Sequence, residues 1–407
     1  MEQESSYRDL AKIPGLSSLI IAATLSRLAG RMFVLALVLF VLARFASPAL
    51  AGWLTFAAIV PGLLISPVAG VLLDRVGPTI AVRIDMIASA VFVAAISLAS
   101  WAGWASPAVL FFLVMLYSLA GPLGAAGTRT LLPRLVPAHA RDRANALDTA
   151  VYAVVDVVGP ALAGLVVAWH GPEITMFLIA TAYAGAAICL SLVPLLPGLA
   201  SKQTSFLRQT LEGIQIVAQQ PTLRGLAISY SLYQVTWGVL YVIVPVFVAS
   251  HYDMAVGSSV TGLLWGAMGI AGGVGALLAG HLRTTGRERH IMAIGMVITA
   301  LAAWPVAAEF GFGGLAIGLM LAGVMAGPID VALLTLRQRR TDPQQLGRVM
   351  SISMSLNLSG FPLGSAIAGM VITSSLSATF VMAGIASVVA ALAIAMIPSD
   401  PAQAETA

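Results

Sequence analysis

The sequence contains very few charged side chains: Asp, Glu, Lys and Arg together make up only 9% of its 407 residues. A soluble domain carries roughly 25% charged residues, so this deficit excludes an ordinary water-soluble globular enzyme. Hydrophobic residues make up 59% of the chain, and the mean hydropathy is +0.95. We therefore expect most of the chain to lie in the hydrocarbon of a lipid bilayer.

Sequence motifs for covalent and metal chemistry are also missing. Cys189 is the single cysteine, so no intrachain disulfide can form, and we expect it to pack within its apolar run. The sequence has no His-Glu-x-x-His, no paired cysteines, no Gly-x-Ser-x-Gly and no phosphate-binding loop, which would mark metal, hydrolase and nucleotide sites. We therefore predict no enzyme activity, no cofactor or metal and no direct use of ATP.

Twelve apolar runs are present, each about 20 residues long and so long enough to cross a bilayer. A segment in lipid must satisfy its own backbone hydrogen bonds, so we expect twelve transmembrane helices and an all-α membrane protein. The first run is too long for the core of a cleavable signal peptide and is predicted to remain as a span. The predicted spans are 17–43, 49–73, 80–101, 107–132, 146–169, 173–196, 223–249, 256–281, 290–308, 312–336, 348–373 and 377–397.

The spans fall into two sets of six. The longest polar stretch separates them, which predicts an N-terminal bundle over 1–198, a cytoplasmic linker over 199–222 and a C-terminal bundle over 223–407. The halves also repeat, because Gly121-Pro122 and Gly327-Pro328 occupy equivalent positions in the fourth and tenth spans. Parallel repeats of six spans, related by a pseudo-two-fold axis, are typical of secondary transporters with a site between the halves at mid-membrane.

The lysines and arginines indicate the orientation of the spans. Of the 21, 18 lie before the first span, at the end of the fourth span, or in or beside alternate connections that share one side; the other three are Arg27, Arg31 and Arg44. Short loops rich in Lys and Arg stay in the cytoplasm, so both termini are predicted to be cytoplasmic in the inner (plasma) membrane. The pI of 9.5 follows from this topology, and no nucleic-acid partner is expected.

The connection after the second span carries a motif that reads Gly70-Val-Leu-Leu-Asp74-Arg75-Val-Gly77-Pro78. It resembles the loop 2–3 signature of the major facilitator superfamily, although the family usually has basic residues where this chain has Pro78-Thr79. Gly77 suits a tight turn with positive φ, and Asp74 can dock against an arginine or a helix N-terminus. The resemblance implies a cytoplasmic gate made of Gly70, Asp74, Arg75, Gly77, Arg129 and Arg134.

Further motifs resemble the branch of this superfamily that holds macrolide, multidrug and siderophore exporters. They lie at 130–137, 143–147, 159–164 and 336–349. Gly159-Pro160-x-x-x-Gly164 is similar to the antiporter motif of the branch, and it predicts either a bendable helix or ordinary close helix packing. Members often carry Gly-Asp in the first span, where this chain has Gly30-Arg31. This departure favours an anionic or zwitterionic substrate over a lipophilic cation.

Charged residues inside spans are functional candidates, because each costs about 2.5–3.5 kcal/mol on the insertion scale. Arg27 and Arg31 are four residues apart and share one face of the first span, as Asp148 and Asp156 do on the fifth. We expect an Arg27–Asp156 or Arg31–Asp156 ion pair. It is either a buried structural bridge or part of the machinery of proton coupling, with Asp156 and Asp148 as proton-binding candidates. A close arginine favours the ionised carboxylate and so weakens the second reading.

Two further acids lie in predicted spans. Asp330, in the tenth span, is the clear intramembrane acid of the second half, and it is predicted to be a cavity carboxylate, a second coupling site or a structural acceptor. Asp85 lies early in the third span, where we expect it to cap a helix or pair with Arg83 or nearby loop groups.

The seventh span carries a stripe of large side chains at helical spacing: Tyr230, Tyr233, Gln234, Trp237 and Tyr241. In the resembled superfamily this span lines the central cavity, so the stripe is predicted to form a substrate wall, together with Arg27, Arg31 and Asp330. Aromatic faces with few polar groups suit a bulky, partly apolar ligand. Plain helix packing is the alternative.

Together these features predict a twelve-helix secondary transporter with two six-helix bundles. The resemblance implies export of a small, bulky organic molecule (drug-like or siderophore-like) by alternating access and proton exchange. The expected partners are the lipid bilayer, the small-molecule substrate and protons, and the chain is expected to be a monomer. Uptake of a siderophore or metabolite and flipping of a lipid or lysolipid are the alternatives, because both use the same architecture.

Overall fold

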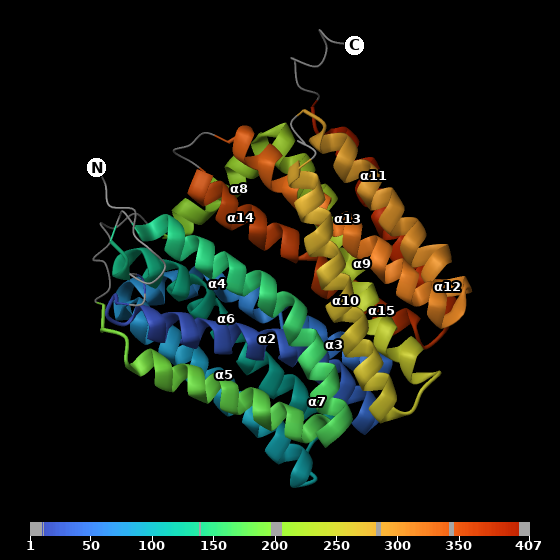
Figure 1. Cartoon of the computed structure of the whole chain (residues 1–407), viewed down its shortest axis with the longest axis horizontal. Coiled ribbons are helices and arrows are strands. Elements are labelled where there is room, and N and C mark those ends of the chain that lie inside the picture. Colours follow the sequence, from blue (N-terminus) through green and yellow to red (C-terminus); the bar gives the residue numbers. More distant parts are fainter. Residues whose placement is uncertain are drawn as a thin grey trace. The chain divides into compact units, whose positions relative to one another are not determined.

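A computed structural model describes residues 10, 12–137, 140–196, 206–281, 286–341 and 346–398. Every regular element within these ranges is a helix, as expected for apolar segments that must pair their own backbone groups (Figure 1). In chain order they are α2 (Leu16–Phe45), α3 (Pro48–Ala57), α4 (Val60–Val76), α5 (Pro78–Trp101), α6 (Pro107–Leu135), α7 (Arg141–Ser191), α8 (Phe206–Gln219), α9 (Pro221–Ala249), α10 (Met254–His281), α11 (Glu288–Leu301), η2 (Ala302–Val306), α12 (Ala307–Glu309), α13 (Gly311–Arg339), α14 (Leu346–Leu358), α15 (Gly360–Val371), α16 (Leu376–Ala393) and η3 (Ile394–Met396).

Eleven of these segments are long and apolar enough to cross a membrane. One of them, 48 residues long, contains two of the predicted spans, so the structure accounts for twelve. The two spans belong to α7, where Gly171 has φ 81° and ψ 166°. The backbone turns at this glycine without a loop, because glycine adopts positive φ at little cost and Pro172 cannot supply a helical N–H.

Three predicted spans are interrupted helices. The second span is α3 followed by α4, with Pro61 in the first turn of α4. The ninth runs through α11, η2 and α12, and Trp304 before Pro305 has the non-helical angles φ −148° and ψ 128°. The eleventh is divided into α14 and α15 at Ser359. Proline lacks the N–H that an α-helix needs, which explains the first two interruptions.

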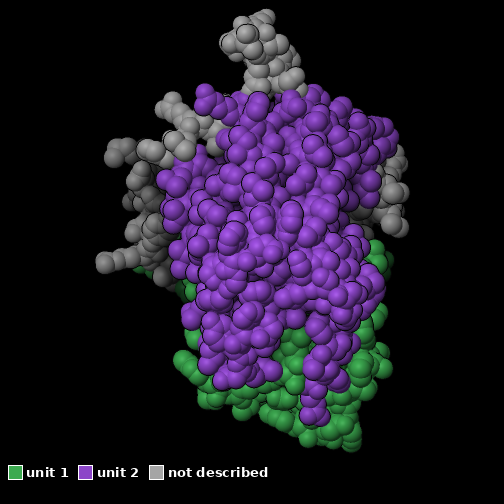
Figure 2. Space-filling view, turned by 90° about the vertical axis from the view of Figure 1, so that its right-hand side faces the viewer, with its two compact units in different colours: residues 1–43, 57–206 green, residues 44–56, 207–407 purple. Residues whose placement is uncertain are grey.

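The chain forms two compact units (Figure 2). The first comprises residues 1–43 and 57–206, and the second comprises residues 44–56 and 207–407. The grouping of 44–56 with the second half was not expected from the sequence. Gly52 of α3 explains it, because a Cβ there would overlap the backbone of Ser365 and Gly369 on α15. Only a glycine lets two helix backbones approach so closely.

The predicted linker contains a helix that was not expected. The described side chains of α8 include Ile216 and Val217, which join a hydrophobic cluster with Leu223, Ala227 and Val349. These residues come from α9 and α14 of the same unit. Burial of this apolar face explains why a comparatively polar segment is helical.

In the first unit, small residues on α6 bring the helices around a polar interior into close contact. A Cβ at Gly124 would overlap the carboxylate of Asp85 on α5, and a Cβ at Gly127 would overlap Val82 on the same helix. Apolar side chains of α2, α5, α6 and α7 fill the space beyond. Their cluster includes Leu19, Met86, Leu131 and Leu190. This packing fixes the positions of the polar side chains described below.

In the second unit, α13 lies directly against α10 through Gly327. A Cβ at this position would overlap the backbone of Gly272 and Ala276, whereas a Cβ at Gly273 meets no atom within 4 Å. We expect Gly327→Ala to lower the melting temperature of the detergent-purified protein, since overpacking costs about 1–3 kcal/mol. Gly273→Ala is the matched control and should melt like the wild type. Equal melting temperatures for the two variants would contradict the predicted contact.

Candidate functional site

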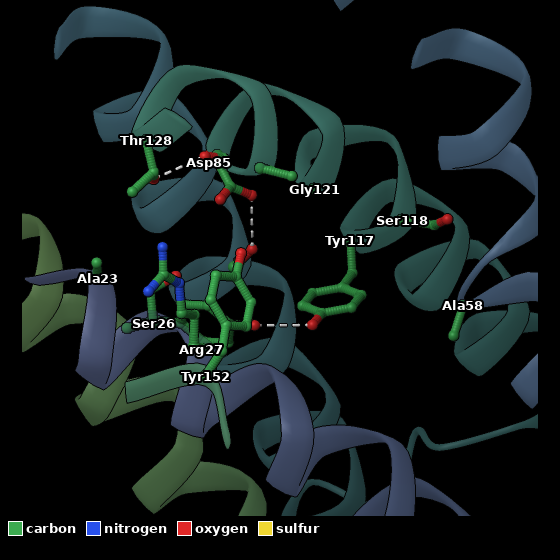
Figure 3. A pocket seen from close by; sticks show the side chains of 14 residues that line it. Ala23, Ser26, Arg27, Ala58, Asp85, Tyr117, Ser118, Gly121, Thr128 and Tyr152 are labelled. Atoms are coloured by element: carbon green, nitrogen blue, oxygen red, sulfur yellow. Dashed lines mark hydrogen bonds between the residues drawn. The ribbon is translucent and has the colours of Figure 1, made fainter. Parts of the chain in front are cut away.

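The first unit contains a polar pocket of about 250 Å³ (Figure 3). Residues from α2, α5, α6 and α7 line it, together with Ala58. Its polar groups include one carboxylate, one arginine, three tyrosines and several hydroxyls. The lining residues are Ala23, Ser26, Arg27, Ala58, Asp85, Ser89, Tyr117, Ser118, Gly121, Gly124, Ala125, Thr128, Tyr152 and Tyr183.

Arg27 forms the enclosed ion pair of this region. Its Nη1 lies 2.6 Å from Oδ1 of Asp148, and the two side chains are only 11% and 18% exposed. The guanidinium also lies over the ring of Tyr152, 3.8 Å from the centroid, in a cation–π geometry. Arg27 therefore pairs with Asp148 rather than with Asp156, the partner considered from sequence.

Arg31 forms the second pair, one helical turn further along α2. Its Nε lies 2.6 Å from Oδ1 of Asp156, which is one of the two pairings expected from the sequence. These side chains are 54% and 49% exposed, so both charges are accessible at the surface. The first arginine of α2 thus pairs with the first of these acids on α7, and the second arginine pairs with the second acid.

The Gly159-Pro160 motif lies at the contact between α2 and α7. A Cβ at Gly159 would come within 2.5 Å of the Cβ of Arg31, so the glycine lets the Arg31–Asp156 pair form at short range. The helical angles continue through Pro160, and Gly171 is the residue where α7 departs from them. Gly164 is buried further along the helix. The motif therefore makes a close packing contact here, as one of the two readings expects, and its role as a bendable segment stays a prediction.

Asp85 lies in the pocket and does not make the expected interactions. Its side chain is buried, with 5% exposure, and Ser89 Oγ donates to its Oδ1 at 3.3 Å. The expectation that it caps a helix or pairs with Arg83 is wrong. Among the described side chains, no arginine or lysine lies within ion-pair distance of it. One sequence signal could have indicated this site. Asp85 and Ser89 are one helical turn apart, and the next span contains the glycine, Gly124, that α6 places against Asp85.

Two tyrosines complete the polar wall, and sequence reasoning missed both. Tyr117 Oη of α6 and Tyr183 Oη of α7 share a hydrogen bond of 2.8 Å. A Cβ on Gly30 of α2 would lie 3.1 Å from Tyr183 Oη, so the glycine before Arg31 leaves room for the two hydroxyls. Neither tyrosine belongs to a periodic pattern in the sequence, so nothing distinguished them from residues that only pack.

In the second unit, the stripe on α9 divides into buried and partly exposed members. Tyr233 is 1% exposed and Trp237 is 8% exposed, and their rings lie 6.0 Å apart. Tyr230, Gln234 and Tyr241 remain half-buried. The stripe therefore shares one face of α9, with Tyr233 and Trp237 buried in it, and its role as a substrate wall stays a prediction.

Asp330 of α13 lies beside this stripe. Tyr230 Oη donates to its Oδ1 at 2.5 Å, and the Asp330 residue is exposed. Arg337, two turns further along α13, is 3% exposed, and its Nη2 donates to the Asn357 side-chain oxygen at 2.7 Å in the amide orientation that satisfies both neighbours. Arg337 was not a sequence candidate, because it lies in a run of basic residues that predicted only topology.

The predicted cytoplasmic gate is described only in part. Gly77 has φ 86° between α4 and α5, as its predicted turn requires, and its N–H donates to Leu73 O. Arg75 is exposed at the end of α4, and Arg134 is half-buried in the last turn of α6. The Gly70, Asp74 and Arg129 positions lie outside the residues whose side chains are described.

Comparison with known proteins extends over nearly the whole chain. The sequence profile of the Major Facilitator Superfamily matches residues 19–284 and 226–407. An uncharacterized MFS-type transporter of Sinorhizobium fredii is 73% identical over 400 residues, covering 98% of this chain and 99% of that protein. The multidrug efflux pump Tap of Mycobacterium tuberculosis is 28% identical over 407 residues, covering 95% and 94% of the two chains.

Solved structures share the fold at low sequence identity. The nucleoside transporter NupG has a TM-score of 0.75 with 14% identity, covering 95% of this chain and all of the other. A POT family transporter has a TM-score of 0.72 with 11% identity, covering 93% and 94%. Together with the profile match and the helical spans, these relatives place the chain, a multi-pass membrane transporter and not an enzyme, in the Major Facilitator Superfamily.

Proposed function

We propose that this transporter exports a small, bulky organic molecule from the cytoplasm by alternating access, in exchange for protons. It would act as a monomer in the inner membrane with both termini in the cytoplasm. The likeness to the multidrug efflux pump Tap over 95% of the chain supports export of a drug-like molecule. The observation that carries the proposal is the set of charged side chains held inside the spans of the first unit.

These charges are difficult to explain as packing alone. Two arginines and two aspartates form pairs at 2.6 Å, and Arg27 of the enclosed pair lines a pocket of about 250 Å³. Replacing a buried ion pair by apolar residues of similar volume is often neutral or stabilising, so stability alone gives no reason to keep them. Ionisable groups that face a cavity inside a membrane protein mark the path of a substrate or ion.

The accessible Arg31–Asp156 pair indicates the chemical class of the substrate. It presents a positive and a negative group 2.6 Å apart, each about half exposed. A zwitterionic molecule can bind both groups. A simple cation would be attracted by the acid but repelled by the arginine beside it. This agrees with the replacement of the usual Gly-Asp by Gly30-Arg31 in the first span.

Asp330 is the proposed coupling residue of the second unit. It is exposed, it accepts a hydrogen bond from Tyr230, and among the described side chains no cation lies within ion-pair distance of it. Asp148 and Asp156 are each engaged in an ion pair with an arginine. We therefore assign these two acids to positioning the arginines and Asp330 to proton exchange.

Coupling at Asp330 can be tested in proteoliposomes with ciprofloxacin, a fluorescent zwitterion. An imposed pH gradient should accelerate transport by the wild type. Asp330→Asn should lose this acceleration but retain exchange of ciprofloxacin without a gradient, because the amide cannot release a proton. Glu309→Gln is the control, since Glu309 is exposed at the end of α12. Full gradient-driven transport by Asp330→Asn would exclude this role.

The two ion pairs should differ in their effect on stability. Arg27→Met leaves the enclosed Asp148 without its partner, and breaking a buried pair costs about 3–5 kcal/mol. Arg31→Met should have a much smaller effect on the melting temperature, because its pair is half exposed. Asp148→Asn in the Arg27→Met background should recover part of the loss. Equal melting temperatures for the two single variants would show that the Arg27 pair is not enclosed.

The direction of transport can be measured in cells. Cells that overproduce the protein should accumulate less ciprofloxacin than cells producing Asp330→Asn, because an exporter lowers the internal concentration. Greater accumulation with the wild type would instead indicate uptake and would overturn the proposed direction.

A further inference from the structure

Among the described acids within the spans of the first unit, one is deeply enclosed and forms no ion pair. Arg27 is paired with Asp148 and Arg31 with Asp156, each at 2.6 Å. Asp85 is this acid, and it is more enclosed than either paired acid, with 5% exposure. An ionised carboxylate without a cation is very costly in such a place. Asp85 must therefore hold a proton or face a cation during part of the transport cycle.

The surroundings of Asp85 are built around its carboxyl group. Gly124 of α6 lies so close that a Cβ there would overlap Oδ2, and the carboxylate occupies the space that a side chain would take. Ser89, 2% exposed, donates to Oδ1 from one turn further along α5. The carboxyl group is thus fixed in place without an ion pair, which is an unusual arrangement for a residue that only packs.

The charged and titratable groups facing Asp85 come from three other helices. They are Arg27 of α2, Tyr117 of α6, and Tyr152 and Tyr183 of α7, all of which line the same pocket. Arg27 is already engaged by Asp148 and Tyr152. Arg83 lies two residues before Asp85 on the same helix, and residues two apart do not face each other. Asp85 therefore titrates among hydroxyl groups and one arginine whose charge is balanced.

The pocket can bring water to this carboxyl group. It is polar, and its volume of about 250 Å³ far exceeds the ~10–15 Å³ that one water needs. The buried Nη2 of Arg27 has no hydrogen-bond partner among the described residues, and a water in the pocket would satisfy it. Tyr117 and Tyr183, joined by a 2.8 Å hydrogen bond, supply further hydroxyls along the wall.

We propose that Asp85, in the polar pocket between α2, α5, α6 and α7, is a second proton-binding site, and that it serves the first unit. Its carboxylate takes a proton from water in the pocket by forming one O–H bond, and it returns that proton to water when the bond breaks. No oxidation or reduction is involved. The inference rests on the proposed proton exchange, but proton binding by Asp85 can be measured without transport.

The direct test is infrared difference spectroscopy of the purified full-length protein during a pH titration without substrate. The wild type should show a protonated-carboxyl band that shifts in D₂O, and Asp85→Asn should lose one component of it. Asp156→Asn is the control and should retain that component, since Asp156 lies outside the pocket and is paired with Arg31. An unchanged band in Asp85→Asn would overturn the inference. Gel filtration and thermal melting identify variants that do not fold.

A second pair of variants tests the same assignment in proteins that still contain Asp85. Gly124→Ala should shift the titration midpoint of the Asp85 component, because the added methyl group displaces the carboxylate. Gly273→Ala in the second unit is the control: it lies outside the pocket and its added methyl group meets no atom within 4 Å, so its midpoint should equal that of the wild type. Identical midpoints in the two variants would contradict the proposed position of the titrating group.

Transport distinguishes a proton from a cationic group of the substrate. In proteoliposomes, Asp85→Asn should lose the acceleration of ciprofloxacin transport by a pH gradient while keeping exchange without a gradient. Loss of ciprofloxacin binding together with an unchanged carboxyl band would show that Asp85 binds the ammonium group instead, and would overturn the inference. If the wild type shows no gradient-driven transport, the proposed function fails, and the infrared result still decides whether Asp85 binds a proton.

Discussion

The cost of placing charge in hydrocarbon determines how the interior of this transporter is arranged. The first unit meets it with two short ion pairs, one enclosed at Asp148 and one accessible at Asp156. Asp85 has no such partner among the described side chains; Ser89 donates to its carboxyl group, and Gly124 leaves the space that this group occupies. The second unit holds Asp330 against Tyr230 instead. Each unit therefore contains one carboxyl group without an ion-pair partner among the described side chains, and these two groups are the proposed sites of proton exchange.

Glycines make these arrangements possible, and each acts by bringing two helices together. Gly159 allows the backbone of α7 to approach Arg31, and Gly124 leaves the space that Asp85 occupies. In the second unit, Gly327 brings α13 against α10. Close packing through small residues is the usual way in which membrane helices associate. Here it also sets the distances between polar groups, so that stability and function depend on the same contacts.

The sequence predicted the spans well, because hydrophobic length is a direct physical requirement of the bilayer. It also predicted the turn at Gly77 and included Arg31–Asp156 among the expected pairs. It could not place Asp85, because residues of three other helices, far apart in the chain, line the pocket around it. It missed α8, whose stability comes from contacts with α9 and α14, and it overestimated the exposure of Tyr233. Periodicity identifies a shared face but not what covers that face.

The most direct test of the account measures protons and substrate together. Purified protein in weakly buffered solution, with a pH indicator, should release protons when ciprofloxacin binds, because substrate and proton occupy the transporter in exchange. The number released should fall in Asp85→Asn and should be unchanged in Glu309→Gln. Binding of ciprofloxacin without any proton release by the wild type would contradict the central claim that unpaired acids couple the two.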